Sequence, residues 1–145
     1  MPDEVSHAPF RPRLARAVTL VLGVLVLGLT AMTVAVLPFS VGDRVGFGLV
    51  GVLIAWFCWR QATVAAVPDA DGLTVRNLLL TRRLAWAEVV LVRFGGGGPW
   101  VQLDLADGDT LAVMGIQRAD GDLAVREARR LATLVAVHTA TPRDD

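Results

Sequence analysis

The chain has 145 residues, of which 54% are hydrophobic, and its mean hydropathy of +0.54 is high for a soluble protein of this length. Its 14 basic residues are all Arg and are balanced by 14 acidic ones, which excludes the strongly basic character that nucleic-acid binding requires. The single cysteine, Cys58, excludes a disulfide framework within one chain.

Two long apolar runs occupy the first half of the chain. Residues 17–37 contain no charged side chain, and a helix of about 20 apolar residues can cross the hydrocarbon core of a membrane. After a break at residues 38–44, a second run covers residues 45–59. This run reaches a spanning length only if its helix continues past Arg60, into a segment (residues 62–67) that is equally suited to a β-strand. The sequence therefore predicts a two-helix transmembrane hairpin over residues 17–61, preceded by a tail at residues 1–16.

A cleaved signal peptide is the alternative interpretation of the first run. Arg11, Arg13 and Arg16 would form its basic region. A signal peptide, however, has an apolar region of about 7–15 residues, and this run is longer and is followed by a second one. The spanning helix is therefore favoured.

Arginines flank the hairpin on both outer sides, whereas the loop between the helices carries one Arg balanced by one Asp. Because positive charge beside membrane segments stays in the cytoplasm, both termini are expected there, with the hairpin in the inner (cell) membrane. Amphipathic rings and snorkelling arginines favour the headgroup level. The predicted interface anchors are Arg16, Trp56, Trp59 and Arg60.

The second half changes to a period of two residues, which is typical of strands. Strands are expected at residues 73–77, 81–85, 90–94, 100–105 and 110–114, with turns at Asp71-Gly72 and Asp107-Gly108. In the third of these strands, Val90, Val92 and Phe94 are expected to share one face. The pattern predicts a series of antiparallel hairpins.

An amphipathic helix closes the sequence. Asp120 or Asp122 is expected to cap its start. An apolar stripe recurs at helical spacing and should face the strands: Ala124, Ala128, Leu131 and Val135. Five to seven short strands with one such helix predict a small barrel or sandwich with a helical plug.

Several segments, in this order, resemble the bacterial PH-like domain family, in particular the actinobacterial group related to low molecular weight protein antigen 6. They are residues 71–77 (DGLTVRN), 81–89 (TRRLAWAEV), the glycines at 95–98, and 113–117 (VMGIQ). The resemblance implies an N-terminal transmembrane helical hairpin followed by an α+β PH-like split β-barrel, with about seven antiparallel strands and a C-terminal capping helix. It places the PH-like domain at residues 62–138 and a tail at residues 139–145, and it implies little about a ligand.

Five residues are the candidate contacts for lipid or a partner: Arg76, Arg82, Arg83, Arg93 and Trp100. Arginines on outward strand faces beside a membrane would attract anionic headgroups by about 1 kcal/mol each. The group is small for a lipid-binding motif, so a solvated, charge-balanced sheet face is the favoured interpretation. Trp100, beside the glycine loop, is a candidate contact for a partner, although packing at the rim of the core is more typical of a Trp.

No catalytic, metal or cofactor site is expected. The four glycines precede a strand rather than the helix that a phosphate loop requires. The Asp-rich turns lack the ligand number of a calcium loop. The side chains suited to nucleophilic or base chemistry are scattered outside the strands, at Ser6, His7, Ser40, Cys58 and His138. The sequence therefore predicts that the protein is not an enzyme.

The leading hypothesis is a non-enzymatic membrane protein whose PH-like domain recruits or scaffolds a protein partner at the cytoplasmic face of the membrane. The alternatives are binding of anionic lipid headgroups by the domain and a role as an accessory subunit of a membrane transport or envelope complex. The expected partners are the lipid bilayer and another protein, with no nucleic acid. The sequence leaves open whether the protein forms a homo-oligomer.

Overall fold

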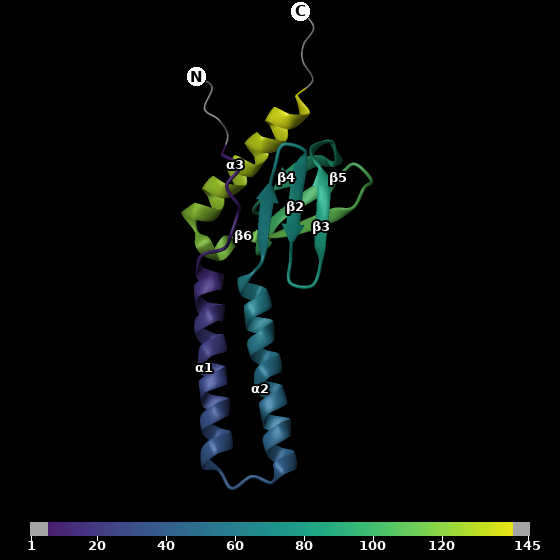
Figure 1. The fold of residues 1–145 in the computed structure, drawn as a ribbon. Helices are drawn as coiled ribbons and strands as arrows, with labels where there is room; N and C mark the ends of the chain where they lie inside the picture. The colour runs from purple at the N-terminus through teal and green to yellow at the C-terminus, as the bar shows by residue number, and fades with distance from the viewer. Residues whose placement is uncertain (1–5, 141–145) are drawn as a thin grey trace, which may run out of the picture. The chain divides into compact units, whose positions relative to one another are not determined.

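The computed structural model describes residues 6–140, which form two compact units (Figure 1). One unit is the helical segment of residues 13–63. The other combines the chain up to Pro12 with the chain from Val64 onward. The chain therefore passes from one unit to the other twice.

The helical unit is a hairpin of α1 (Leu14–Val36) and α2 (Val41–Ala62). Both helices are long and apolar enough to cross a membrane, and most of their large apolar side chains are exposed. Ser40 and Asp43 form a capping box at the start of α2, with the Asp43 N–H donating to the Ser40 Oγ at 3.2 Å. Gly51 is buried where it faces Thr30 of α1, so that a side chain at this position would collide with Thr30.

The segment at residues 62–67 is divided between the two elements that compete for it. Helix α2 ends at Ala62, and the Thr63 hydroxyl donates to the Arg60 carbonyl at 2.8 Å. Strand β1 (Ala65–Pro68) begins after Val64. Because α2 has 22 residues, it reaches a membrane-spanning length without the residues that form the strand.

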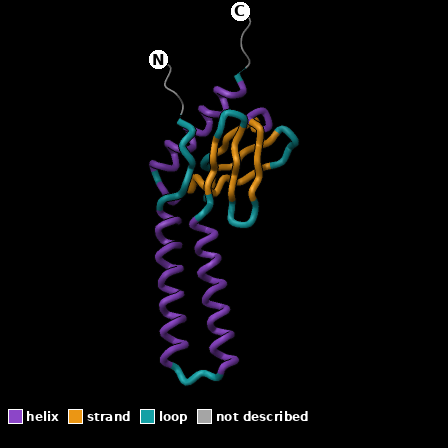
Figure 2. The backbone as a smooth tube through the Cα atoms, viewed as in Figure 1, coloured by secondary structure: helices purple, strands orange, loops and turns teal. Residues whose placement is uncertain are grey.

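The other unit contains six strands among the described residues, arranged as two antiparallel sheets (Figure 2). The first sheet has the order β1-β2-β3, with β2 at Gly72–Arg76 and β3 at Thr81–Ala85. The second has the order β4-β5-β6, formed by Val89–Arg93, Trp100–Leu105 and Thr110–Gln117. The short helix η1 (Trp86–Glu88) connects the sheets, and η2 (Arg118–Asp120) leads into α3 (Asp122–Thr139). This PH-like sandwich with a C-terminal helix confirms the predicted fold class.

The core lies between the two sheets and α3. The predicted stripe of α3 is buried, and Leu73, Leu84 and Leu103 from the strands are fully buried against the same cluster. The N-cap position of α3 is Gly121, which lies between Asp120 and Asp122, the two residues expected to cap the helix. Asp122 lies instead in the first turn, where a carboxylate is favourable beside the positive end of the helix dipole.

The residues before α1 complete this core. Phe10 is fully buried and forms a β-bridge with Ala66, with N–H to carbonyl distances of 2.8 and 2.9 Å. Arg130 of α3 stacks on the Phe10 ring, with the guanidinium carbon 3.9 Å from the ring centroid, and donates to the carbonyls of Ser6 and Ala8. We call residues 6–12 the N-terminal strap. This packing differs from the tail that the sequence predicts for residues 1–16. The last predicted tail, residues 139–145, lies beyond the described residues from position 141 onward.

Candidate binding surface

An apolar strand edge is the most prominent candidate surface of the PH-like unit. Strand β4 pairs only with β5 in the described part of the chain, so its second edge has no strand partner. The prediction that Val90 shares one face with Val92 and Phe94 was wrong. The register shifts between Val89 and Leu91, so Val89 is buried whereas Val90 and Leu91 are 65% and 51% exposed. Val92 and Phe94 pack partly against the core as expected.

A groove of about 520 Å³ opens at the C-terminal end of this edge. Its lining includes Val92, Phe94, Trp100 and part of the glycine loop that joins β4 to β5. Three loop glycines, at positions 95–97, have positive φ angles, which fix a backbone path that other residues rarely adopt. Trp100 is half-buried at the start of β5 and forms part of the groove wall.

The four candidate arginines do not form one patch. Thr74 pairs with Arg83 and Arg76 with Thr81, so Arg76 and Arg83 share the outward face of the first sheet. Arg82 lies opposite the buried Val75, on the other face, and Arg93 belongs to the second sheet.

Three of these arginines lie beside acidic side chains. Arg83 is 2.8 Å from an Asp69 oxygen, and Arg93 is 2.7 Å from an Asp104 oxygen. Arg82 lies 3.4 Å from Asp107 and 3.9 Å from Asp109. Arg76 is exposed. The positive charge expected to attract anionic headgroups is therefore largely compensated.

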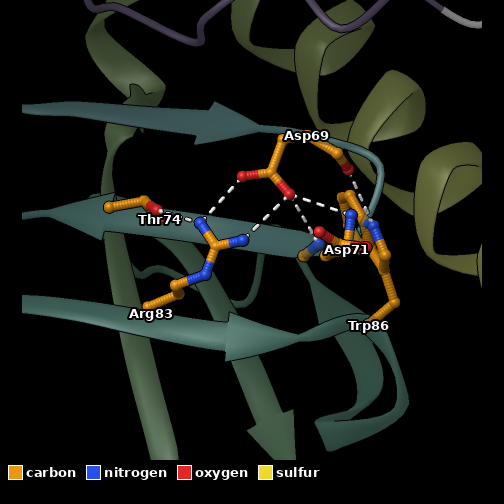
Figure 3. Close-up of polar contacts among 6 residues, drawn as sticks. Asp69, Asp71, Thr74, Arg83 and Trp86 are labelled. Atoms are coloured by element: carbon orange, nitrogen blue, oxygen red, sulfur yellow. Dashed lines mark hydrogen bonds and ion pairs between the residues drawn. The ribbon is translucent and has the colours of Figure 1, made fainter.

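Asp69 is the centre of the best-defined polar network (Figure 3). Its two carboxylate oxygens accept from the Arg83 guanidinium at 2.8 and 3.1 Å, and one of them also accepts from the N–H groups of Asp71 and Gly72. The hydrogen bond from Arg83, followed by the bond from the Asp71 N–H, lowers the pKa of Asp69 below 3.8. The hydrogen bond to Asp69 in turn raises the pKa of the Arg83 guanidinium above its usual range. Because both side chains are solvent-exposed, the network fixes the β1–β2 turn more than it supplies a reactive group.

Trp86 is buried. Its Nε1–H donates to the Asp69 carbonyl at 3.0 Å, and its ring stacks on His138 with a centroid distance of 4.7 Å. His7 of the N-terminal strap packs edge-on against His138 at 5.6 Å. The two histidines lie near opposite ends of the sequence, and only the fold brings the strap to the end of α3. Among the described residues, no group of His, Cys, Asp and Glu side chains is arranged to hold a metal ion.

The predicted interface anchors all lie on the two apolar helices. Arg16 is exposed near the start of α1, and Trp56 and Trp59 are exposed near the end of α2. Arg60 follows them in the last turn and is half-buried. These positions suit side chains at a headgroup layer, although the role of the four residues stays a prediction.

Comparison with known proteins gives a family match and several mycobacterial relatives. Residues 63–133 match the family model described as "Bacterial PH domain". Uncharacterized proteins of Mycobacterium bovis and Mycobacterium tuberculosis are 38% identical to this chain over 98 residues. The matched region covers 68% of this chain but 64% of each relative, so the chain spans less than two thirds of the proteins that it matches. No solved structure matches the chain significantly.

Proposed function

Residues 63–133 belong to the bacterial PH domain family, as the resemblance predicted, and from this premise we propose that the protein is a non-enzymatic, membrane-anchored adaptor. In this proposal the PH-like domain recruits or scaffolds another protein at the cytoplasmic face of the membrane. The two apolar helices supply the anchor. Domains of this family are generally non-catalytic, which supports a binding role.

The observation that carries the proposal is the β4 edge with its adjoining groove. Exposed apolar side chains on an unpaired strand are normally avoided, because such an edge pairs readily with another chain. Here Val90 and Leu91 occupy that edge, and the groove beside Trp100 follows it directly. An extended segment of a partner would add a strand to β4 and place one side chain in the groove, whose volume of about 520 Å³ is ample for it.

Binding of anionic headgroups has less structural support than this proposal. A headgroup-binding surface depends on several uncompensated basic side chains that act together. In this domain three of the four candidate arginines have acidic neighbours, and only Arg76 and Arg83 share a face. The accessory-subunit hypothesis is compatible with the proposed adaptor and differs in the identity of the partner.

The N-terminal strap supports the proposed orientation. Because residues before α1 and residues after α2 belong to the same unit, the hairpin must begin and end on the same side of a membrane that it spans. Only one Arg stands in the loop between the helices or next to it, whereas several precede α1 and follow α2. The excess of positive charge on the side of the domain favours the cytoplasm.

Photo-crosslinking in native membranes tests the proposal. A photoreactive amino acid would replace Leu91 at the β4 edge, with the exposed Val137 of α3 as the matched control position. We expect a distinct protein adduct from position 91 that is absent at position 137. The adduct should weaken when Val90→Lys places a charge on the same edge. The proposal fails if both positions give the same adducts.

A further inference from the structure

The loop between β2 and β3 carries a second apolar feature, at the opposite end of the first sheet from the Asp69 turn (Figure 2). Leu79 is 80% exposed, more than any other large apolar side chain in the described part of the chain, and Leu80 beside it is 56% exposed. We call Leu79 and Leu80 the leucine tip. Tight turns favour Gly, Asn, Asp and Ser, so nothing in the turn chemistry requires two leucines at these positions.

Asn77 holds the leucine tip in place. Its backbone N–H donates to the Leu80 carbonyl at 2.8 Å and closes the loop. Its buried side chain donates to the Ala112 carbonyl at 2.7 Å and accepts from the Met114 N–H at 3.1 Å, which ties the loop to β6. The leucines are therefore presented outward by a fixed loop, and they do not need to be ordered again when they bind.

The strand register shows at which end of the sheet this tip lies. Arg76, the last residue of β2, pairs with Ala65, the first residue of β1. Ala65 follows the end of α2 after only Thr63 and Val64, and a connection of this length spans at most about 10 Å. The leucine tip and the chain arriving from the membrane helix thus share one end of the first sheet.

Charge near the tip is nearly balanced. Arg76 precedes the loop, and Arg82 follows it beside Asp107 and Asp109 of the β5–β6 turn. An acidic or basic protein surface would find little complementary charge here. The side chains exposed at the tip are apolar. The proposed membrane helices attach the chain to a bilayer, whose interior is also apolar.

We propose that Leu79 and Leu80 insert into the interfacial layer of the membrane that the protein's own helices span. The inference rests on the membrane location proposed above and is independent of the protein partner at β4. Insertion by apolar side chains predicts a contact that does not depend on anionic lipid or on salt, in contrast to attraction of headgroups by arginines.

Fluorescence quenching of the full chain in lipid nanodiscs tests the proposal. In a Cys58→Ala background, single cysteines at Leu79, Ala70 or Leu25 would carry the same environment-sensitive dye. Ala70 is an exposed control in the β1–β2 turn, and Leu25 reports on α1. With phosphatidylcholine alone, we expect dyes at positions 79 and 25 to be quenched by nitroxide lipids and protected from aqueous iodide. The dye at position 70 should show the reverse.

The outcomes separate the two proposals. If position 25 is quenched by lipid but position 79 behaves like position 70, the leucine tip does not insert and only this inference fails. If position 25 is itself open to iodide, the membrane location fails and this inference fails with it. Protection of position 79 that requires phosphatidylglycerol and disappears at high salt would replace apolar insertion by headgroup attraction. Adding Leu80→Ser should lower the protection of position 79 several-fold while leaving position 25 unchanged.

Discussion

At the scale of single residues, Phe10 is a core side chain whose burial is not indicated by the residues around it in the sequence. It stands among exposed residues in a segment without periodic pattern, yet it is fully buried against the sandwich. Burial of a Phe side chain contributes about 1.5–3 kcal/mol, and the stacked Arg130 guanidinium adds a cation–π contact. One residue before α1 is therefore part of the core of a domain that otherwise follows α2.

We expect Phe10→Ala to destabilise the PH-like unit by about 3–5 kcal/mol, because the cavity cannot be filled without moving the bridge to Ala66. Hydrogen exchange of the full chain, followed by mass spectrometry, would measure this as lost protection in β1 and α3. Val137→Ala, at an exposed position of α3, is the control and should change stability by no more than about 0.5 kcal/mol. Unchanged protection in the Phe10 variant would contradict the assignment of the N-terminal strap to the core.

The Asp69–Arg83 pair predicts that the folding stability of the domain depends on pH in the acidic range. Because the native pKa of Asp69 lies below its unfolded value of 3.8, its contribution is complete above about pH 4 and is lost as the pH falls through the lowered native pKa. Asp69→Asn retains an oxygen for the N–H groups of Asp71 and Gly72 but removes the charge. We therefore expect the variant to lose less stability than the native chain between neutral and acidic pH.

Thermal unfolding at a series of pH values would measure this difference. Arg83→Gln should flatten the acid dependence only in part, because the Asp69 carboxylate still accepts from the N–H groups of Asp71 and Gly72. The double variant should match Asp69→Asn, since neither has a carboxylate to protonate at this position. An acid dependence in Asp69→Asn as steep as that of the native chain would show that the pair does not control it.

At the scale of elements, the crossing of β6 over β1 and the N-terminal strap leaves no room for a side chain. A Cβ atom at Gly115 would lie 2.8 Å from the Phe10 carbonyl oxygen and 2.9 Å from the Ala66 nitrogen. Both atoms take part in the bridge between the strap and β1, so neither can move away without loss of a hydrogen bond. The three segments are therefore coupled through backbone contact.

Through this overpacking, Gly115→Ala should lower the free energy of unfolding by about 1–3 kcal/mol. The strap and β1 should lose protection from amide exchange first. Amide exchange in those two segments is the measurement. Gly98→Ala is a matched control, because its new Cβ would meet no atom closer than 3.7 Å. Equal exchange in the two variants would contradict the close approach at Gly115.

The sequence predicted the elements better than their contacts. Alternation located the strands, and helical spacing identified the buried face of α3, because both signals are local. The orientation of Val90 was missed because a bulge at the start of β4 shifts the alternation by one position, and no residue type marks that shift. The ion pairs of Arg82, Arg83 and Arg93 depend on strand register and on which turns meet, and neither can be inferred from spacing along the chain.

At the scale of the whole molecule, the hairpin interrupts the domain in sequence. Residues up to Pro12 and residues from Val64 onward belong to one unit, and the complete hairpin stands between them. The sequence predicts the two helices and the domain but not this discontinuity, because a seven-residue segment has too little pattern to indicate a contact with a strand that follows both helices. The domain is consequently connected to the helices at two points of the chain.

The N-terminal strap also links the folding of the domain to the biogenesis of the protein. Phe10 leaves the ribosome before both helices, whereas its partner Ala66 follows them, so the bridge forms only after the hairpin has been made. In a chain that inserts only one helix, Phe10 and Ala66 would stand on opposite sides of the membrane, and the sandwich would lack a core residue. Such a chain would expose apolar surface and become a substrate for membrane proteases. The buried phenylalanine thereby makes correct insertion of both helices a condition for a stable domain.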